Sequence, residues 1–178
     1  MKVNPNLEFL YIHSTNNSMW QTREVFDFFS KESKEKIGTL VCHKTKSEFR
    51  PDYKGSILAV DFLVTAEHNK GHGKKILKFA EEYSRQVGCN GYMSLKSDVS
   101  YTPQSIPHLF YRKYGFSTLD KSADKKMDRF IKQNKPATYK DFPCLLMHYP
   151  PAAEKENLLI KTAKNLLHDF LDCLGIPE

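Results

Sequence analysis

Apolar residues form a continuous run of strand length near the middle of the chain. The run is Ile57-Leu58-Ala59-Val60-Asp61-Phe62-Leu63-Val64, and a single acid, Asp61, interrupts it. A continuous apolar run of this length is typical of a central strand that is buried on both faces. Because strand side chains alternate between two faces, we expect Asp61 to share a face with Ala59 and Leu63.

Beyond this run the apolar period changes from that of a strand to that of a helix. Apolar residues recur at helical spacing from Ile76 to Val87, and Gly88 follows where a helix C-terminal glycine belongs. This pattern predicts a helix from about Gly73 to about Val87.

Shorter patterns predict the remaining elements. Alternation and turn residues predict a first strand at 7–13 before a polar turn at 14–18, and an antiparallel hairpin of 23–29 and 37–43 around the turn 30–36. The segment 91–96 alternates and predicts a strand parallel to the central one, reached through the helical crossover. We further predict a short helix at 105–114, the start of a strand at 115–117 and a last strand at 144–149.

The last 28 residues of the sequence predict an amphipathic helix. Apolar residues recur at helical spacing there, at Leu159, Ala163, Leu166, Leu167, Phe170 and Leu174. An apolar stripe of this kind needs burial. We therefore expect a main domain over 1–150 and a helical extension over 151–178, packed on that domain or on a partner.

The turn between the central strand and its helix has the composition of a phosphate-binding loop. Gly71 and Gly73 let the main chain approach a ligand closely, and the first turn of the helix adds unpaired N–H groups and the positive end of its dipole. Lys70, Lys74 and Lys75 add positive charge. A glycine pair before a helix is also compatible with an ordinary turn.

Two motifs together resemble the GCN5-related N-acetyltransferase family. The first is His68-Asn69-Lys70-Gly71-His72-Gly73, here called the glycine loop, where the family usually begins with Gln or Arg. The second is Leu109-Phe110-Tyr111-Arg112-Lys113-Tyr114-Gly115-Phe116, here called the tyrosine motif. The resemblance spans roughly Glu24 to Tyr149. It implies a mixed α/β fold of the acyl-CoA N-acyltransferase type, with acetyl-CoA bound where the central strand and the next parallel strand separate.

The resemblance also implies particular site residues. The positions that correspond to acetyl-CoA contacts are Leu63, Val64, His68, Asn69, Lys70, Gly71, His72, Gly73, Lys74, Gln104 and Tyr111. Family members usually place two helices between the first strand and the hairpin, and the interval here is too short for both. One wall of the acceptor groove would then come from the C-terminal extension or a second subunit, so a homodimer stays open.

The chemistry of acyl transfer to an amine assigns roles to two residues. A thiolate leaving group needs a proton donor, and Tyr111 suits this task because a phenol with a reference pKa near 10 is protonated at neutral pH. Its alternative role is aromatic packing. Asp61 is the candidate base, since a carboxylate within an apolar strand is costly unless it is paired or used. A structural salt bridge is the alternative for Asp61.

Composition narrows the remaining classes. The 178 residues suit one soluble domain, no run is long enough to span a membrane, and the N-terminus lacks the apolar segment of a signal peptide, so we expect a cytoplasmic protein. Four cysteines are scattered without metal-ligand spacing, and we expect reduced thiols and no metal. The net charge of +6 gathers in the basic segment 112–140, which fits a solvated helix and loop or a surface that steers CoA.

The sequence therefore predicts an enzyme, an acetyl-CoA-dependent N-acetyltransferase in which a primary amine attacks the thioester directly. The acceptor stays open among polyamines, aminoglycosides, amino acids, protein amines and charged tRNA. An alternative is a CoA-binding regulatory or interaction module with the same fold and little or no turnover. A third reading, in which the basic surface binds nucleic acid, is the least favoured.

Overall fold

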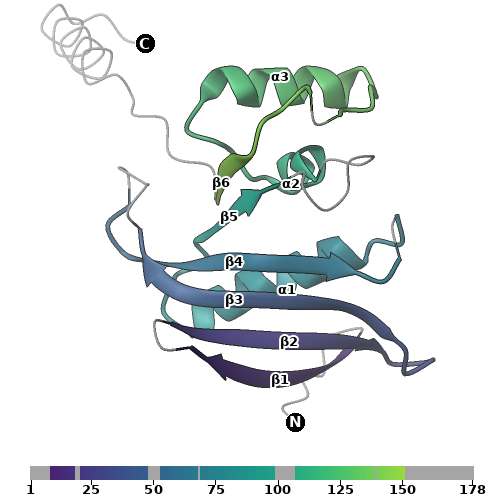
Figure 1. The fold of residues 1–178 in the computed structure, drawn as a ribbon, viewed down its shortest axis with the longest axis vertical. Helices are drawn as coiled ribbons and strands as arrows, with labels where there is room; N and C mark the ends of the chain where they lie inside the picture. The colour runs from purple at the N-terminus through teal and green to yellow at the C-terminus, as the bar shows by residue number, and fades with distance from the viewer. Residues whose placement is uncertain are drawn as a thin grey trace, which may run out of the picture.

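The computed structural model describes residues 9–18, 21–47, 53–67, 69–98, 107–138 and 140–150. His68, Gln104, Cys173 and the predicted C-terminal helix over 151–178 lie outside the described residues. One mixed sheet organises the described part of the chain (Figure 1). Its strands follow the chain order: β1 (Phe9–Asn17), β2 (Thr22–Ser30), β3 (Lys36–Lys46), β4 (Ser56–Thr65), β5 (Met93–Ser97) and β6 (Leu145–Tyr149).

All neighbouring strands are antiparallel except β4 and β5, which run parallel. The helix α1 (His72–Gln86) makes the crossover between these two strands, and α2 (His108–Tyr114) and α3 (Lys121–Lys132) lie between β5 and β6 in the chain. This architecture confirms the predicted mixed α/β fold, the hairpin, the crossover helix and the parallel strand after it. The predicted last strand is confirmed as β6.

The core lies between the sheet and α1, which contacts β3 and β4. Gly38 on β3 permits this close packing, because a Cβ atom there would lie 2.6 Å from Ile76 Cδ1 on the helix. Aromatic rings fill the space towards β1 and β2, with Phe28 and Phe79 in edge contact at 5.1 Å. The spacing of apolar residues thus fixed which side of α1 is buried, and a small residue on β3 lets it approach.

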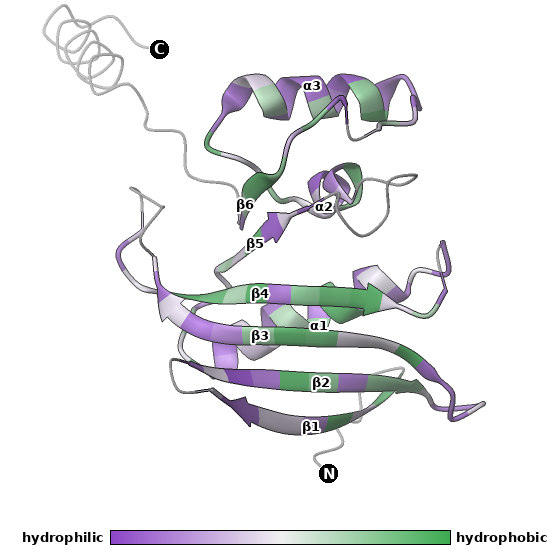
Figure 2. Ribbon diagram, viewed as in Figure 1, coloured by the Kyte–Doolittle hydropathy of each residue, from purple (hydrophilic) through white to green (hydrophobic). Residues whose placement is uncertain are grey.

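Three local predictions are wrong. The polar turn expected at 14–18 is strand instead, because β1 continues to Asn17 in register with Thr22 of β2. The segment 115–117 forms only an isolated bridge, between Ser117 and His148. The central strand is not buried on both faces, since Phe62 and Val64 are 44% and 43% exposed. Figure 2 shows β4 as a mostly hydrophobic strand with a polar band within it.

The basic segment 112–140 contains α3, which is amphipathic. Asp120 caps its N-terminus by accepting a hydrogen bond from the Ser122 N–H at 2.8 Å, and Met127 and Phe130 are buried. Arg112 donates to both carboxylate oxygens of Asp128 at 2.7 Å, which holds the Asp128 pKa below its usual value. Part of the positive charge of this segment is therefore neutralised within the fold.

None of the helices in the described ranges is long and apolar enough to cross a membrane. The described cysteines, Cys42, Cys89 and Cys144, are all free thiols, as the sequence predicts, and the first two are buried.

Because the core lies between β3 and α1, replacing a leucine there should cost far more stability than replacing an exposed leucine. Leu40 is fully buried on β3 under α1, whereas Leu119 is 49% exposed. We expect Leu40→Ala to lower the free energy of unfolding by about 2–5 kcal/mol because it leaves a cavity, and Leu119→Ala by about 0.5 kcal/mol or less. Urea unfolding followed by circular dichroism measures both, and equal losses would contradict this placement of the core.

Candidate active site

A β-bulge places Asp61 within β4. Val41 of β3 pairs with Phe62 and the next residue, Cys42, pairs with Val60, so Asp61 is the extra residue on β4. The bulge breaks the expected alternation. Asp61 lies on the face of the sheet away from α1, as Ala59 does, but Leu63 lies on the other face and packs against the core, contrary to the sequence expectation.

β4 loses its contact with β5 at the same point. The parallel pairing covers only Leu58, Ala59 and Val60 of β4, although β4 continues to Thr65 (Figure 1). We call residues 61–65 the unpaired end of β4, because only β3 pairs with it among the described strands. This stretch begins at Asp61, the bulged residue, so the bulge and the end of the pairing with β5 lie at the same position.

The register shows which main-chain groups of the unpaired end are engaged. The Ala66 N–H donates to Ile37 O at 3.0 Å, and hydrogen-bonded and non-hydrogen-bonded pairs alternate along an antiparallel ladder. Val64 therefore pairs with Thr39 of β3 through its backbone, whereas the N–H and C=O groups of Leu63 and Thr65 point away from β3. Two of the residues that the resemblance implied for acetyl-CoA contacts lie on β4, and of these Leu63 has this orientation and Val64 has not.

The glycine loop opens the N-terminus of α1 to a ligand. Gly71 is the N-cap residue with φ +78°, and no side chain caps the helix. The first hydrogen bond across this end runs from the Lys75 N–H to Gly71 O at 3.3 Å, which leaves the N–H groups of His72, Gly73 and Lys74 without intrahelical acceptors. A Cβ atom on Gly71 would have no neighbour within 4 Å. This end of α1 is accessible, with donors directed outwards.

Side chains add to the positive character of this end. The first turn of α1 holds no acidic residue, and Lys74 is exposed. Lys70 lies 3.7 Å from Glu67 in an exposed pair, and Asn69 adopts a left-handed φ of 60°. The Nδ1 atom of His72 is buried and has no hydrogen-bond partner among the described residues.

Gly73 joins the glycine loop to the tyrosine motif. A Cβ atom on Gly73 would lie 2.9 Å from the ring of Phe110, so α2 packs directly on the first turn of α1. Tyr114 reinforces this contact by donating a hydrogen bond to Glu81 of α1 at 3.2 Å. A larger residue at position 73 would therefore first collide with Phe110. The structure brings the two motifs together, although 35 residues and more separate them in the chain.

Tyr111 lies beside this contact on α2. Its side chain is 8% exposed and packs between Phe110 and Phe116, with ring centroids 5.2 and 5.7 Å away. Burial raises the pKa of Tyr111 to about 12, because the phenolate would lose hydration. The phenol is therefore protonated throughout the physiological pH range. Its contacts with Phe110 and Phe116 also suit the alternative role, in which the ring serves only in aromatic packing.

Asp61 is the centre of a polar cluster on the face away from α1. Its Oδ2 atom accepts hydrogen bonds from Arg23 Nε at 3.0 Å and from His43 Nδ1 at 2.8 Å. Since a carboxylate can only accept, His43 carries a proton on Nδ1, and Nε2 keeps a lone pair in the neutral form of the ring. His43 is not among the site residues predicted from the sequence. The signal was its position in a strand that pairs with the central one, but the sequence does not show that register.

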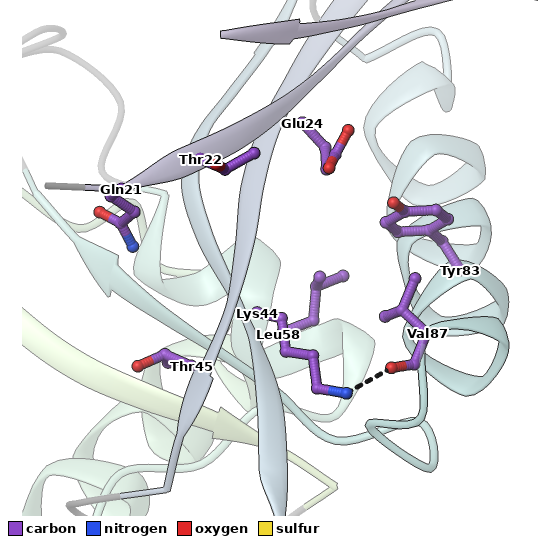
Figure 3. A pocket seen from close by; sticks show the side chains of 8 residues that line it. All are labelled: Gln21, Thr22, Glu24, Lys44, Thr45, Leu58, Tyr83 and Val87. Atoms are coloured by element: carbon purple, nitrogen blue, oxygen red, sulfur yellow. Dashed lines mark hydrogen bonds between the residues drawn. The ribbon is translucent and has the colours of Figure 1, made fainter. Parts of the chain in front are cut away.

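A separate pocket of about 560 Å³ lies at the other end of α1. Figure 3 shows its lining side chains, among them Glu24 of β2, Lys44 of β3 and Tyr83 of α1, with Lys44 Nζ donating to Val87 O at 2.8 Å. The helix has 15 residues, so roughly 22 Å separates this pocket from the glycine loop. None of the residues implied for acetyl-CoA binding lines it. Within the described ranges, no group of His, Cys, Asp or Glu residues could hold a metal ion.

Comparisons with known proteins give a likeness to solved structures only. No protein-family model matches the chain, and no curated protein matches it. A structure of Arabidopsis thaliana NAA60 in complex with a bisubstrate analogue matches with 15% identity and a TM-score of 0.42, over 55% of this chain and 63% of that one. A putative GnaT-family acetyltransferase from Bordetella pertussis matches with 10% identity and a TM-score of 0.43, over 71% and 65%.

A KacTA–DNA complex matches with 14% identity and a TM-score of 0.43, over 83% of this chain and 74% of that one. The chain thus spans less than two thirds of the length of two of these structures. No activity follows from likeness at this level. In its two motifs and its parallel β4–α1–β5 crossover, the chain resembles the GCN5-related N-acetyltransferases.

Proposed function

We propose that this chain is an acetyltransferase that moves the acetyl group of acetyl-CoA to a primary amine. The contact between Gly73 and Phe110 carries the proposal, because it brings the glycine loop and the tyrosine motif to the same end of α1. Free N–H groups at a helix N-terminus suit a pyrophosphate, and a buried phenol nearby suits a thiolate that needs a proton. Acetyl-CoA carries a pyrophosphate and a thioester in one molecule.

The described residues fit this cofactor. The N–H groups of His72, Gly73 and Lys74 would hold the pyrophosphate, with Lys70 and Lys74 adding positive charge. The open space at Gly71 supports a close approach of ligand to main chain. The backbone groups of Leu63 and Thr65 would hold the amide arm of CoA.

The proposed reaction needs two proton transfers, one to the leaving sulfur and one from the attacking nitrogen. Acetyl-CoA supplies an activated acyl group, whose carbon gains a bond to the acceptor nitrogen and loses its bond to sulfur. Tyr111 Oη donates a proton to the sulfur, and its raised pKa keeps that proton available. His43 Nε2 accepts the proton that the nitrogen loses. Asp61 is then a positioning residue for His43 and no longer the base itself, since its Oδ2 atom is engaged by Arg23 and His43.

The first test compares two glycines at opposite ends of α1. Gly71 and Gly88 have φ angles of +78° and +79°, so replacing either with Ala costs similar backbone strain. Acetyl-CoA at ~100 times its dissociation constant should stabilise the parent by about 2.7 kcal/mol. We expect Gly71→Ala to lose most of this stabilisation and Gly88→Ala to keep it, as measured by thermal unfolding.

Free CoA and ATP are the ligand controls in this experiment. Stabilisation by CoA but not by ATP would separate CoA recognition from general phosphate binding. If acetyl-CoA shifts neither the parent nor Gly88→Ala, the proposed cofactor is wrong. Stabilisation without turnover on any amine would instead favour the CoA-binding module.

A second test concerns Tyr111 and the pH dependence of the reaction. We expect Tyr111→Phe to lower kcat by roughly 10²-fold while acetyl-CoA stabilises the variant as before. Tyr83→Phe is the control, because burial also raises the Tyr83 pKa to about 12 but this residue lies towards the other end of α1. Because the Tyr111 pKa is raised, the acid should stay protonated and the parent should show no loss of kcat from this group up to about pH 10. An unchanged kcat in Tyr111→Phe would assign the ring to packing alone.

A third test separates the roles of His43 and Asp61. We expect His43→Ala to lower kcat by roughly 10²-fold with little change in the KM for acetyl-CoA, and Asp61→Asn to lower kcat as well, since the amide can turn the imidazole into the wrong tautomer. If Asp61 acts through His43, the double variant should be no slower than His43→Ala alone. Losses that multiply would contradict this order of action. His13→Ala is the control, because His13 also pairs with a carboxylate, that of Glu24.

A further inference from the structure

The face of β1–β4 opposite α1, here called the outer face, carries apolar side chains that the described residues do not cover. Cross-strand pairs place Val25, Val41 and Phe62 in one row across the strands. The next row runs from Ile12 through Asp27 and Thr39 to Val64, so its apolar residues lie at its two ends. Directly paired residues lie on the same face of a sheet. Ile12 is 57% exposed, and Phe62 and Val64 are 44% and 43% exposed.

The carboxylates of the outer face are already paired with neighbouring groups. Asp27 accepts a hydrogen bond from Thr39 Oγ1 at 2.7 Å and lies 2.7 Å from Lys36 Nζ. Asp61 is held by Arg23 and His43. These groups need no further partner, so what this face lacks is an apolar cover. Phe62 and Val64 lie in neighbouring rows on β4, with Val25 and Val41 in the row of Phe62. Such a cluster differs from the single exposed apolar residues that are normal on a surface.

We propose that residues 151–178 of the same chain dock on the outer face through their apolar stripe. The stripe consists of residues at helical spacing, Leu159, Ala163, Leu166, Leu167, Phe170 and Leu174. A helix of this kind needs an apolar surface, and the outer face carries an apolar cluster that the described residues leave uncovered. The inference does not depend on the proposed catalytic activity.

The register of the sheet shows that the connection is long enough. Tyr149 pairs with Met93, which pairs with Leu58 of β4, so the chain leaves β6 level with Leu58. From there, Phe62 lies four residues along β4, about 13 Å, and β3 lies three strand spacings from β6, about 14 Å. The combined distance is roughly 19 Å. The eight residues 151–158 can span up to about 26 Å before the stripe begins.

The test is a cross-linking experiment on the full chain. A short bismaleimide is applied to Val64→Cys combined with Leu166→Cys, in a background where the exposed Cys144 and the C-terminal Cys173 are Ser. We expect an intramolecular link in most molecules, identified by peptide mass mapping, with no increase in molecular size. The pair Ile12→Cys with Phe170→Cys repeats the test at a second place, in case the first variant does not fold.

Leu146→Cys combined with Leu166→Cys is the matched control. Leu146 is 39% exposed but lies on β6, outside the outer face. Intramolecular linking at least fivefold above this control in either test pair supports the proposal. Covalent dimers as the main product would show that a second copy covers the face, and linking no greater than the control in both pairs would show that the segment does not dock there. Either result overturns the proposal.

Discussion

The bulge at Asp61 is the constraint on which the proposed site depends. One extra residue in β4 turns Asp61 and Phe62 to the outer face, returns Leu63 to the core and coincides with the end of the pairing with β5. A regular strand would have kept alternating and could have stayed paired along its length. The same irregularity thus produces the unpaired main chain of β4 and the carboxylate that holds His43.

The two ends of α1 differ in kind. At its N-terminus, free N–H groups, a left-handed Gly71 and the ring of Phe110 bring together parts of the chain that are distant in sequence. At its C-terminus, Lys44 satisfies the carbonyl of Val87 and a pocket opens beside Tyr83. The dipole of the helix favours an anion only at the first of these ends. This asymmetry supports placing the pyrophosphate of CoA there.

The proposals for catalysis and for docking meet on the outer face. Arg23, His43 and Asp61 lie on the face that residues 151–178 are proposed to cover, next to the apolar row of Val25, Val41 and Phe62. A docked helix would leave this cluster at its border and would supply a wall for the acceptor amine. β1 and β2 are joined by a short turn that supplies no such wall, because only residues 18–21 lie between them.

The sequence by itself determined most of the strands, the crossover through α1 and the two motifs, because these follow from local periodicity and from glycine at particular positions. It did not place α3, and it predicted a strand from 115 where only an isolated bridge forms. Tertiary structure decided the rest. The bulge depends on the register between β3 and β4, and the pairing of His43 with Asp61 follows from that register. The contact of Phe110 with Gly73 depends on how α2 packs on α1. A sequence shows which residues can form an element, but partners across strands and between helices are fixed only when the whole sheet and its core are assembled.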